Sequence, residues 1–153
     1  MLSQEYIIGN YLDFKSNQLH IDAKQRKVMV VMMQELNDLQ QYKLETLFLA
    51  VSIADRYLLF LANRSEEAPC LVLLGVTSMM LAAKLEQFEI PSFDVMHHFL
   101  NKSHGIGVTL GDFVKLEITV IRVLQFNLNY VSPLSFLDRF LRIFELDLEE
   151  NDE

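Results

Sequence analysis

The sequence is poor in residues that break or cross-link a chain. Its 153 residues include five glycines, three prolines, one cysteine and no tryptophan, whereas hydrophobic residues make up 51%. So few breakers exclude a collagen-like or loop-rich chain, and the apolar fraction excludes intrinsic disorder. The single cysteine, Cys70, cannot form an intramolecular disulfide, which is typical of a reducing compartment. The length suits one compact domain rather than two.

Basic residues are also scarce. The chain has 13 Lys and Arg against 21 Asp and Glu, a formal net charge of −8. A protein that binds duplex nucleic acid needs a basic face, so this balance argues against such a partner. Six of the acids lie in residues 145–153, which hold no base. The rest of the chain, with 15 acids and 13 bases, is nearly neutral.

The sequence lacks a hydrophobic run long enough to cross a membrane. The longest run, residues 69–83, is interrupted by Thr77 and Ser78. As a helix it would span roughly 22 Å, short of the roughly 30 Å hydrocarbon core. Residues 1–5 have no basic region of a signal peptide. We therefore predict no membrane partner, and we expect Cys70, within the run, to be a small core hydrophobe.

Helical periodicity dominates the sequence and predicts an all-α fold. A helix capped by Asp22 and Gln25 carries an apolar stripe of Val28, Val31, Met32, Leu36 and Leu39. Helices are expected over residues 3–14, 44–62, 68–86, 91–100, 109–126 and 134–146, with a turn at 103–107. Further caps are Thr109 with Asp112, and Ser132 with Pro133.

The segment 68–86 is apolar on nearly every side. A helix of that kind lies in the middle of a bundle, surrounded by other helices. Gly75 within it is expected to permit close approach of a neighbouring helix.

Signals of catalysis or metal binding are weak. The four histidines are His20, His97, His98 and His104, and none has the i,i+4 spacing that lets two imidazoles share a metal. No cysteine partner supports a zinc site. The pair Gly105 and Gly107 lacks the strand and lysine of a phosphate loop. We predict no metal and no cofactor, and a binding module rather than an enzyme.

Charged residues interrupt two of the apolar stripes. Asp55 shares a helix face with Val51 and Leu58, and two interpretations are evenly matched. Asp55 either forms a buried pair with Arg26, whose fork suits a carboxylate, or meets water at a helix rim.

Lys84 and Glu117 are the second case. Lys84 complements the negative end of its helix, and Glu117 lies between Phe113 and Ile121 on its own face. On the residues alone, a helix-end lysine and a rim glutamate are favoured. The other interpretation is that the two residues bind a partner helix. Neighbouring apolar side chains would then supply affinity, and the two charges would set the register of the helix.

Three segments in order resemble the cyclin box, most closely that of mitotic A/B-type cyclins. They are ETLFLAVSIADRYL at 45–58, LGVTSMMLAAKLE at 74–86, and LEITVIRVLQFNL at 116–128 followed by PLSFL. The resemblance extends from about residue 6 to 140. It implies a five-helix bundle around a central third helix. The expected parts are an N-terminal helix and connector (1–20), the cyclin box (21–131), and a linker helix with an acidic tail (132–153).

The resemblance implies a regulatory subunit that binds and activates a cyclin-dependent kinase by positioning the kinase C-helix, in the nucleus and/or cytoplasm. Such a subunit is expected to carry no catalytic residue. It assigns kinase binding to Lys84, Glu117, Leu81, Leu85, Ile121, Phe126, Leu128 and Ile8. It also favours a structural ion pair between Arg26 and Asp55.

The family's substrate-docking patch is degenerate in this chain. Its positions are Gln25, Val28, Met29, Met32 and Val72. Gln25 replaces a methionine, Met32 a tryptophan and Val72 a glutamine, so docking of Arg-x-Leu substrates or inhibitors is expected to be weakened. Gln87 replaces the second acid of the usual Lys-x-Glu-Glu.

The 153 residues hold one box, without the second box common in mitotic cyclins. The chain is either a one-box protein or a fragment of a longer one. These departures leave a second hypothesis, a non-activating adaptor with the same fold. A DNA-binding factor is disfavoured by the charge.

Overall fold

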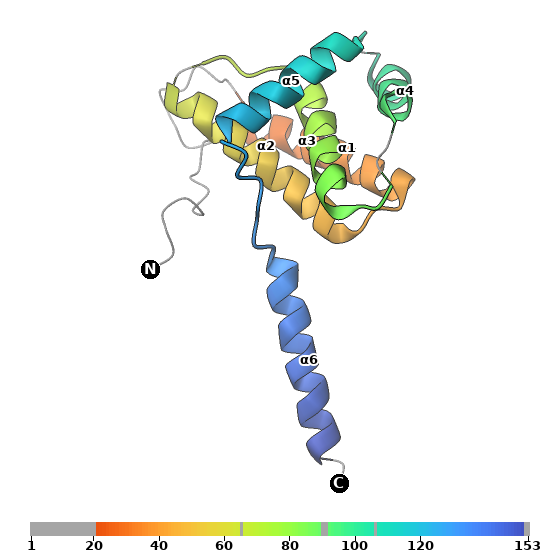
Figure 1. The fold of residues 1–153 in the computed structure, drawn as a ribbon, viewed down its shortest axis with the longest axis vertical. Coiled ribbons are helices and arrows are strands. Elements are labelled where there is room, and N and C mark those ends of the chain that lie inside the picture. Colours follow the sequence, from red (N-terminus) through yellow and green to blue (C-terminus); the bar gives the residue numbers. More distant parts are fainter. Residues whose placement is uncertain (1–20, 65, 90–91, 106, 152–153) are drawn as a thin grey trace.

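The computed structural model describes residues 21–64, 66–89, 92–105 and 107–151. All the regular secondary structure in these residues is helical, which confirms the predicted fold class. The helices are α1 (Ala23–Gln40), α2 (Leu44–Arg64), α3 (Leu71–Glu86), α4 (Phe93–His104), α5 (Leu110–Val123) and α6 (Pro133–Asn151). The first five form a bundle, and α6 extends away from it (Figure 1).

The α3 helix is the centre of the bundle, as its apolar sequence predicts. It contacts α1, α2, α4 and α5. Its buried residues run without a break from Leu74 to Ala83. Burial on every side explains why this helix lacks a polar face.

Gly75 is the point where α1 comes closest to α3. A Cβ built on Gly75 would lie 2.5 Å from Met32 Cε, 3.2 Å from Met29 Cγ and 3.3 Å from Met33 Cγ. Any larger residue would displace packed methionines, so the glycine sets the spacing between the two helices.

The predicted N-terminal caps are present. Asp22 Oδ1 accepts the Gln25 N–H at 2.7 Å, and Gln25 Oε1 accepts the Asp22 N–H at 2.9 Å. Thr109 and Asp112 form the same capping box at α5. Ser132 Oγ accepts the Leu134 N–H at the start of α6. These local bonds satisfy backbone donors that the first turn leaves open.

The predicted apolar stripe of α1 is partly wrong. Val28, Val31 and Leu39 are exposed, and the core side is made by Met29, Met32, Met33 and Leu36. Apolar residues lie on both sides of this helix, so periodicity alone could not choose the buried one.

The prediction for Cys70 is also wrong, because its side chain is exposed. Cys70 is the N-cap of α3, one residue before the buried helix begins. It therefore lies at the edge of the apolar run rather than inside the bundle.

Several helix boundaries differ from the prediction. The α3 helix begins at Leu71 rather than 68, and α5 ends at Val123 rather than 126. The α4 helix continues to His104 and is closed by Gly105, whose φ of 61° gives a left-handed C-cap. The α6 helix continues into the acidic segment, to Asn151. Within the part of the chain that the structure describes, no helix combines the length and hydropathy needed to cross a bilayer.

Candidate functional site

An ion pair joins the end of α3 to the middle of α5. Lys84 Nζ donates to Glu117 Oε1, and the two side chains are 37% and 14% exposed. Lys84 lies in the last turn of α3, where its charge also complements the helix dipole. Because the Lys84 side chain is more than a third exposed, water screens the pair, which contributes only about 0–1 kcal/mol to folding.

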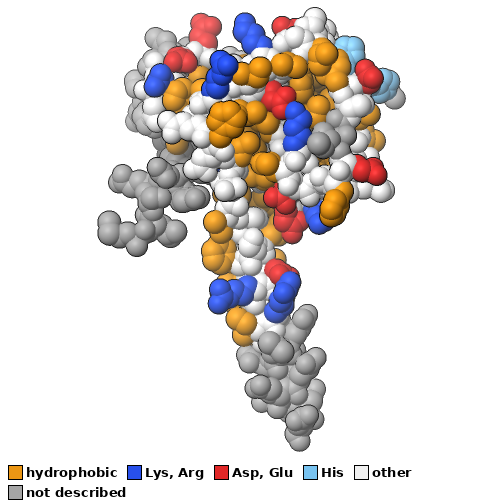
Figure 2. All heavy atoms as spheres, in the orientation of Figure 1, with side chains coloured by type: hydrophobic (Ala, Val, Ile, Leu, Met, Phe, Trp, Pro, Cys, Tyr) orange, Lys and Arg blue, Asp and Glu red, His pale blue; other side chains and the backbone are white. Residues whose placement is uncertain are grey.

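Apolar side chains of graded exposure surround this pair. Leu81 is buried, one turn before Lys84, whereas Leu85 is 54% exposed. On α5, Ile121 is half-buried one turn after Glu117. Figure 2 shows hydrophobic side chains gathered over this face of the bundle, with acidic and basic side chains among them. The surface thus has an apolar floor and a charged edge.

A strained turn follows α5 and presents Phe126. Gln125 and Phe126 have φ angles of 53° and 59°, in the left-handed region that few residues other than glycine adopt. The Phe126 N–H donates to the Ile121 carbonyl at 2.9 Å, which closes the turn. The Phe126 side chain is 78% exposed, so its ring makes few contacts within its own chain. The strained turn therefore holds an aromatic side chain at the surface.

A pocket of about 420 Å³ lies beside these residues. Its walls come from the start of α2, the end of α3, the α5–α6 linker and the first turn of α6. They are Glu45, Leu49, Leu85, Glu86, Leu128, Asn129, Tyr130, Val131, Ser132 and Ser135. Leu85 and Leu128 were predicted as site residues, and the others were missed. The linker has no periodicity, so no sequence signal placed it against α2.

Gln87 has a structural role that sequence reasoning also missed. Its Nε2 donates to Thr46 Oγ1 at 2.6 Å, and its N–H donates to the Ala83 carbonyl at 2.9 Å. Thr46 is fully buried at the start of α2. These bonds fix the end of α3, which carries Lys84 and Leu85.

The structure brings Arg26 and Asp55 together in a bidentate ion pair. Arg26 Nε donates to Asp55 Oδ1 at 2.9 Å, and Nη2 donates to Oδ2 at 2.6 Å. Asp55 is buried and Arg26 is half-buried. Of the two interpretations of Asp55, the structure therefore shows the pair between α1 and α2.

The docking-patch positions lie around a groove of about 320 Å³ between the N-terminal ends of α1 and α3. Gln25, Val28, Met29 and Val72 line it, together with Asp22, Lys24 and Leu71. Met32 does not line the groove, and its side chain packs against Gly75 of α3. A docking role for the groove stays a prediction.

Ile8 and the helix expected over residues 3–14 lie outside the described residues, as does His20. His97 is half-buried and contacts Phe93 and Asn101, whereas His98 is exposed. No group of three or more His, Cys, Asp or Glu side chains suited to a metal ion occurs in the described ranges.

Comparison with known proteins finds one family over most of the chain. The family described as "Cyclin, N-terminal domain" matches residues 1–129. The chain is 31% identical over 135 residues to "Cyclin-B2-1" of Oryza sativa subsp. japonica, covering 88% of this chain and 30% of the relative. It is 34% identical over 134 residues to "Putative cyclin-A3-1" of Arabidopsis thaliana, covering 86% and 35%.

A third relative is "G2/mitotic-specific cyclin-2" of Medicago sativa, which is 28% identical over 134 residues. That match covers 88% of this chain and 39% of the relative. The chain therefore spans between 30% and 39% of the length of these three relatives.

Proposed function

We propose a kinase-regulating role for this chain from one premise: the chain belongs to the cyclin family, whose N-terminal domain matches residues 1–129. Its relatives include proteins named as B-type, A-type and G2/mitotic-specific cyclins, which makes it a cyclin of the cell-cycle class. The specific proposal is that it binds a cyclin-dependent serine/threonine kinase and holds the kinase C-helix in its active position.

The observation that carries the proposal is the Lys84–Glu117 pair beside an apolar surface. A lysine ammonium supplies three donors and a carboxylate only acceptors, so the pair can bind both carbonyl and N–H groups of a partner backbone. The buried Leu81 and the half-buried Ile121 and Leu128 would receive an apolar side chain of the kinase helix.

Activation would follow from differential binding. Protein kinases need the C-helix glutamate to pair with the lysine that positions ATP, and that pairing depends on where the helix lies. A protein that binds only the active position of the helix shifts the kinase toward it. In this mechanism the chain contributes no catalytic residue and acts as a regulatory subunit, in the nucleus and/or cytoplasm.

A point variant tests the proposal directly. Glu117→Ala is expected to weaken binding to a purified cyclin-dependent kinase by about tenfold, or 1.4 kcal/mol, with the melting temperature unchanged within about 2 °C. The small shift is expected because Glu117 is partly exposed and its pair adds little to folding. Binding is measured by calorimetry and phosphorylation by a kinase assay.

Lys115→Ala is the matched control, because it removes an exposed charge from the opposite side of α5. It should bind as the unchanged chain does. A large drop in melting temperature for Glu117→Ala would make Glu117 structural. Failure of the unchanged chain to bind or activate any cyclin-dependent kinase would overturn the proposal.

The groove at Gln25 and Val72 favours a second candidate, a non-activating adaptor with the cyclin fold. Its floor lacks Met32, and Val72 offers no hydrogen bond from its side chain to a docking peptide. An adaptor would bind the kinase, or another protein, without raising phosphorylation. The same kinase assay separates the two functions, and a titration with an Arg-x-Leu peptide measures what docking remains.

A further inference from the structure

The last turn of α3 carries two of the residues proposed to bind the kinase, yet little of this turn is buried. Ala83 is the last buried residue of the helix. Lys84, Leu85 and Glu86, which follow it, are exposed. Helix ends with few buried contacts open at free energies close to zero. The positions of Lys84 and Leu85 therefore depend on the contacts that tie this turn to the rest of the bundle.

The backbone leaves α3 without a left-handed closing residue. Many helices end at such a residue, usually glycine, whose N–H helps to satisfy the last carbonyls. The C-cap of α3 is Gln87, and its φ of −108° and ψ of 149° are those of extended chain. Its N–H still donates to the Ala83 carbonyl at 2.9 Å. Beyond this bond, the end of the helix has to be secured by a side chain.

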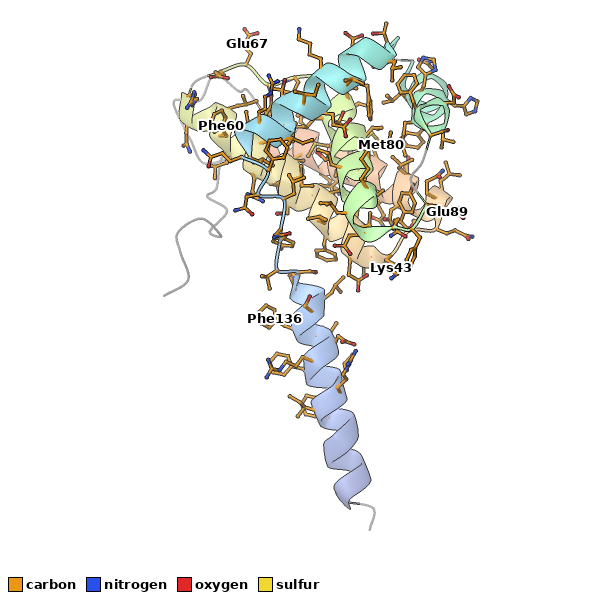
Figure 3. All side chains as sticks on the ribbon, in the orientation of Figure 1. Lys43, Phe60, Glu67, Met80, Glu89 and Phe136 are labelled. Carbon is orange, nitrogen blue, oxygen red and sulfur yellow. The ribbon has the colours of Figure 1, made fainter. Side chains whose placement is uncertain are left out.

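The Gln87 side chain supplies such a contact. Its Nε2 donates to Thr46 Oγ1 at 2.6 Å, across 41 residues of sequence. Thr46 is fully buried in the first turn of α2, so the acceptor is held in place by packing. Figure 3 shows Lys43, which precedes α2, and Glu89, which follows α3, at the same end of the bundle. The bond thus joins the open end of α3 to a rigid point of α2.

A glutamine suits this position better than an acid. The pocket beside the bond is lined by Glu45 and Glu86, the neighbours of Thr46 and Gln87 in sequence. A carboxylate at position 87 would add a third negative charge there and could not donate to Thr46 Oγ1. The neutral amide donates without adding charge. The departure from the usual Lys-x-Glu-Glu is therefore matched by a bond within the bundle.

We propose that Gln87 is a positioning residue for kinase binding, which acts through Thr46. Its bond keeps the last turn of α3 formed, and this holds Lys84 and Leu85 where the kinase meets them. The inference rests on the proposed function, because it concerns the same surface. A binding-competent conformation that is only partly populated weakens the apparent affinity by that fraction. One hydrogen bond changes such a population ratio by about fivefold, so Gln87 affects affinity without touching the kinase.

Amide hydrogen exchange, followed by NMR, tests this bond without any partner. Gln87→Ala should speed exchange at residues 84–87 by about fivefold and leave the buried centre of α3, residues 74–80, unchanged. Gln34→Ala is the matched control, because it makes the same substitution at an exposed position of α1. It should leave both sets of amides as they are. Unchanged exchange at 84–87 in Gln87→Ala, or faster exchange over the whole of α3, would overturn the proposal.

Variants of Thr46 separate the hydrogen bond from packing. Thr46→Val keeps the buried volume but removes the acceptor, whereas Thr46→Ser keeps the acceptor and removes a methyl group. Thr46→Val should speed exchange at 84–87 as Gln87→Ala does, and the two changes together should have no further effect. Thr46→Ser should keep exchange slow at these residues even though the lost methyl group lowers the melting temperature. The reverse order would mean that Thr46 acts by packing alone, and would contradict the proposal.

Calorimetric titration with a purified cyclin-dependent kinase tests the consequence for binding. Gln87→Ala and Thr46→Val should each raise the Kd by about two- to fourfold, whereas Gln34→Ala should leave it unchanged. Full affinity in Gln87→Ala, despite faster exchange at 84–87, would overturn the positioning role alone. An unchanged chain that binds no cyclin-dependent kinase would overturn the proposed function and this role together, so the two failures are distinct.

Discussion

Phe126 has a strained backbone conformation and an exposed side chain. A substitution at this residue can therefore raise the stability of the fold and still weaken the binding of a partner. Left-handed geometry costs a non-glycine residue roughly 1–2 kcal/mol, and glycine avoids most of that cost. Because the ring is mostly exposed, its removal loses little burial. We predict that Phe126→Gly raises the free energy of unfolding by about 0.5–1 kcal/mol and weakens kinase binding.

Gln125→Gly is the control for this prediction, because it relieves the neighbouring strained residue and keeps the ring. It should stabilise the bundle to a similar extent and leave binding unchanged. Urea unfolding and calorimetric titration measure the two quantities. A Phe126→Gly chain that is less stable than the unchanged chain would show that the ring supports the turn.

Single residues were predictable where local chemistry decided their role. Asp22 and Thr109 cap helices because their partners lie three residues away. On the residue pattern alone Asp55 was undecided, and only the family resemblance favoured its pairing with Arg26. Arg26 lies 29 residues earlier, and the packing of α1 on α2 brings the two side chains together. The turn at Phe126 contains no glycine or proline, so no residue type indicated that α5 ends at Val123.

The N-terminus of α5 gives a pH-dependent prediction for one helix. Hydrogen bonds from the Thr109 hydroxyl and N–H hold the pKa of Asp112 below its ordinary value of 3.8. A carboxylate with a lowered pKa stabilises the fold above its ordinary value, and this contribution is lost as the pH falls through the folded pKa. The capping box is therefore complete at neutral pH and fails in acid.

We predict that Thr109→Ala lowers the free energy of unfolding by about 1 kcal/mol at pH 7, the usual cost of losing an N-cap. The difference from the unchanged chain should shrink as the pH falls through the lowered pKa of Asp112, where its carboxylate becomes protonated in both. Urea unfolding at pH 7 and over a series of acidic pH values measures it. An NMR titration should show the pKa of Asp112 returning toward 3.8 in the variant, and an unchanged pKa would contradict the assigned cause.

Within the residues that the structure describes, the helices were predictable in number and type, but their buried sides were less so. The α3 helix is apolar all round, and a central position is the one place that suits it. The α1 helix has valines on one side and methionines on the other. Gly75 decides between them, because a residue without a side chain accepts the long methionines of the neighbouring helix.

At the scale of the molecule, the chain consists of a bundle and a projecting helix with different chemistry. In the described residues the core cluster ends at Leu124, with Leu128 and Tyr130 of the linker packed against it, and includes no residue of α6. The family resemblance predicted the bundle. It did not predict which α6 side chains are exposed, because an amphipathic pattern indicates a buried face without naming what buries it.

This division leads to a prediction about truncation. A chain that ends at Ser132 loses α6 but keeps the whole core cluster. Its free energy of unfolding should stay within about 0.5 kcal/mol of that of the full chain, since distant, exposed groups contribute little. A chain that ends at Val123 is the control: it also loses Leu124, Leu128 and Tyr130, and should be less stable by several kcal/mol. Urea unfolding followed by circular dichroism gives both values. A large loss on removal of α6 alone would mean that the helix packs on the bundle in solution, and its apolar face would then be covered by the chain's own core.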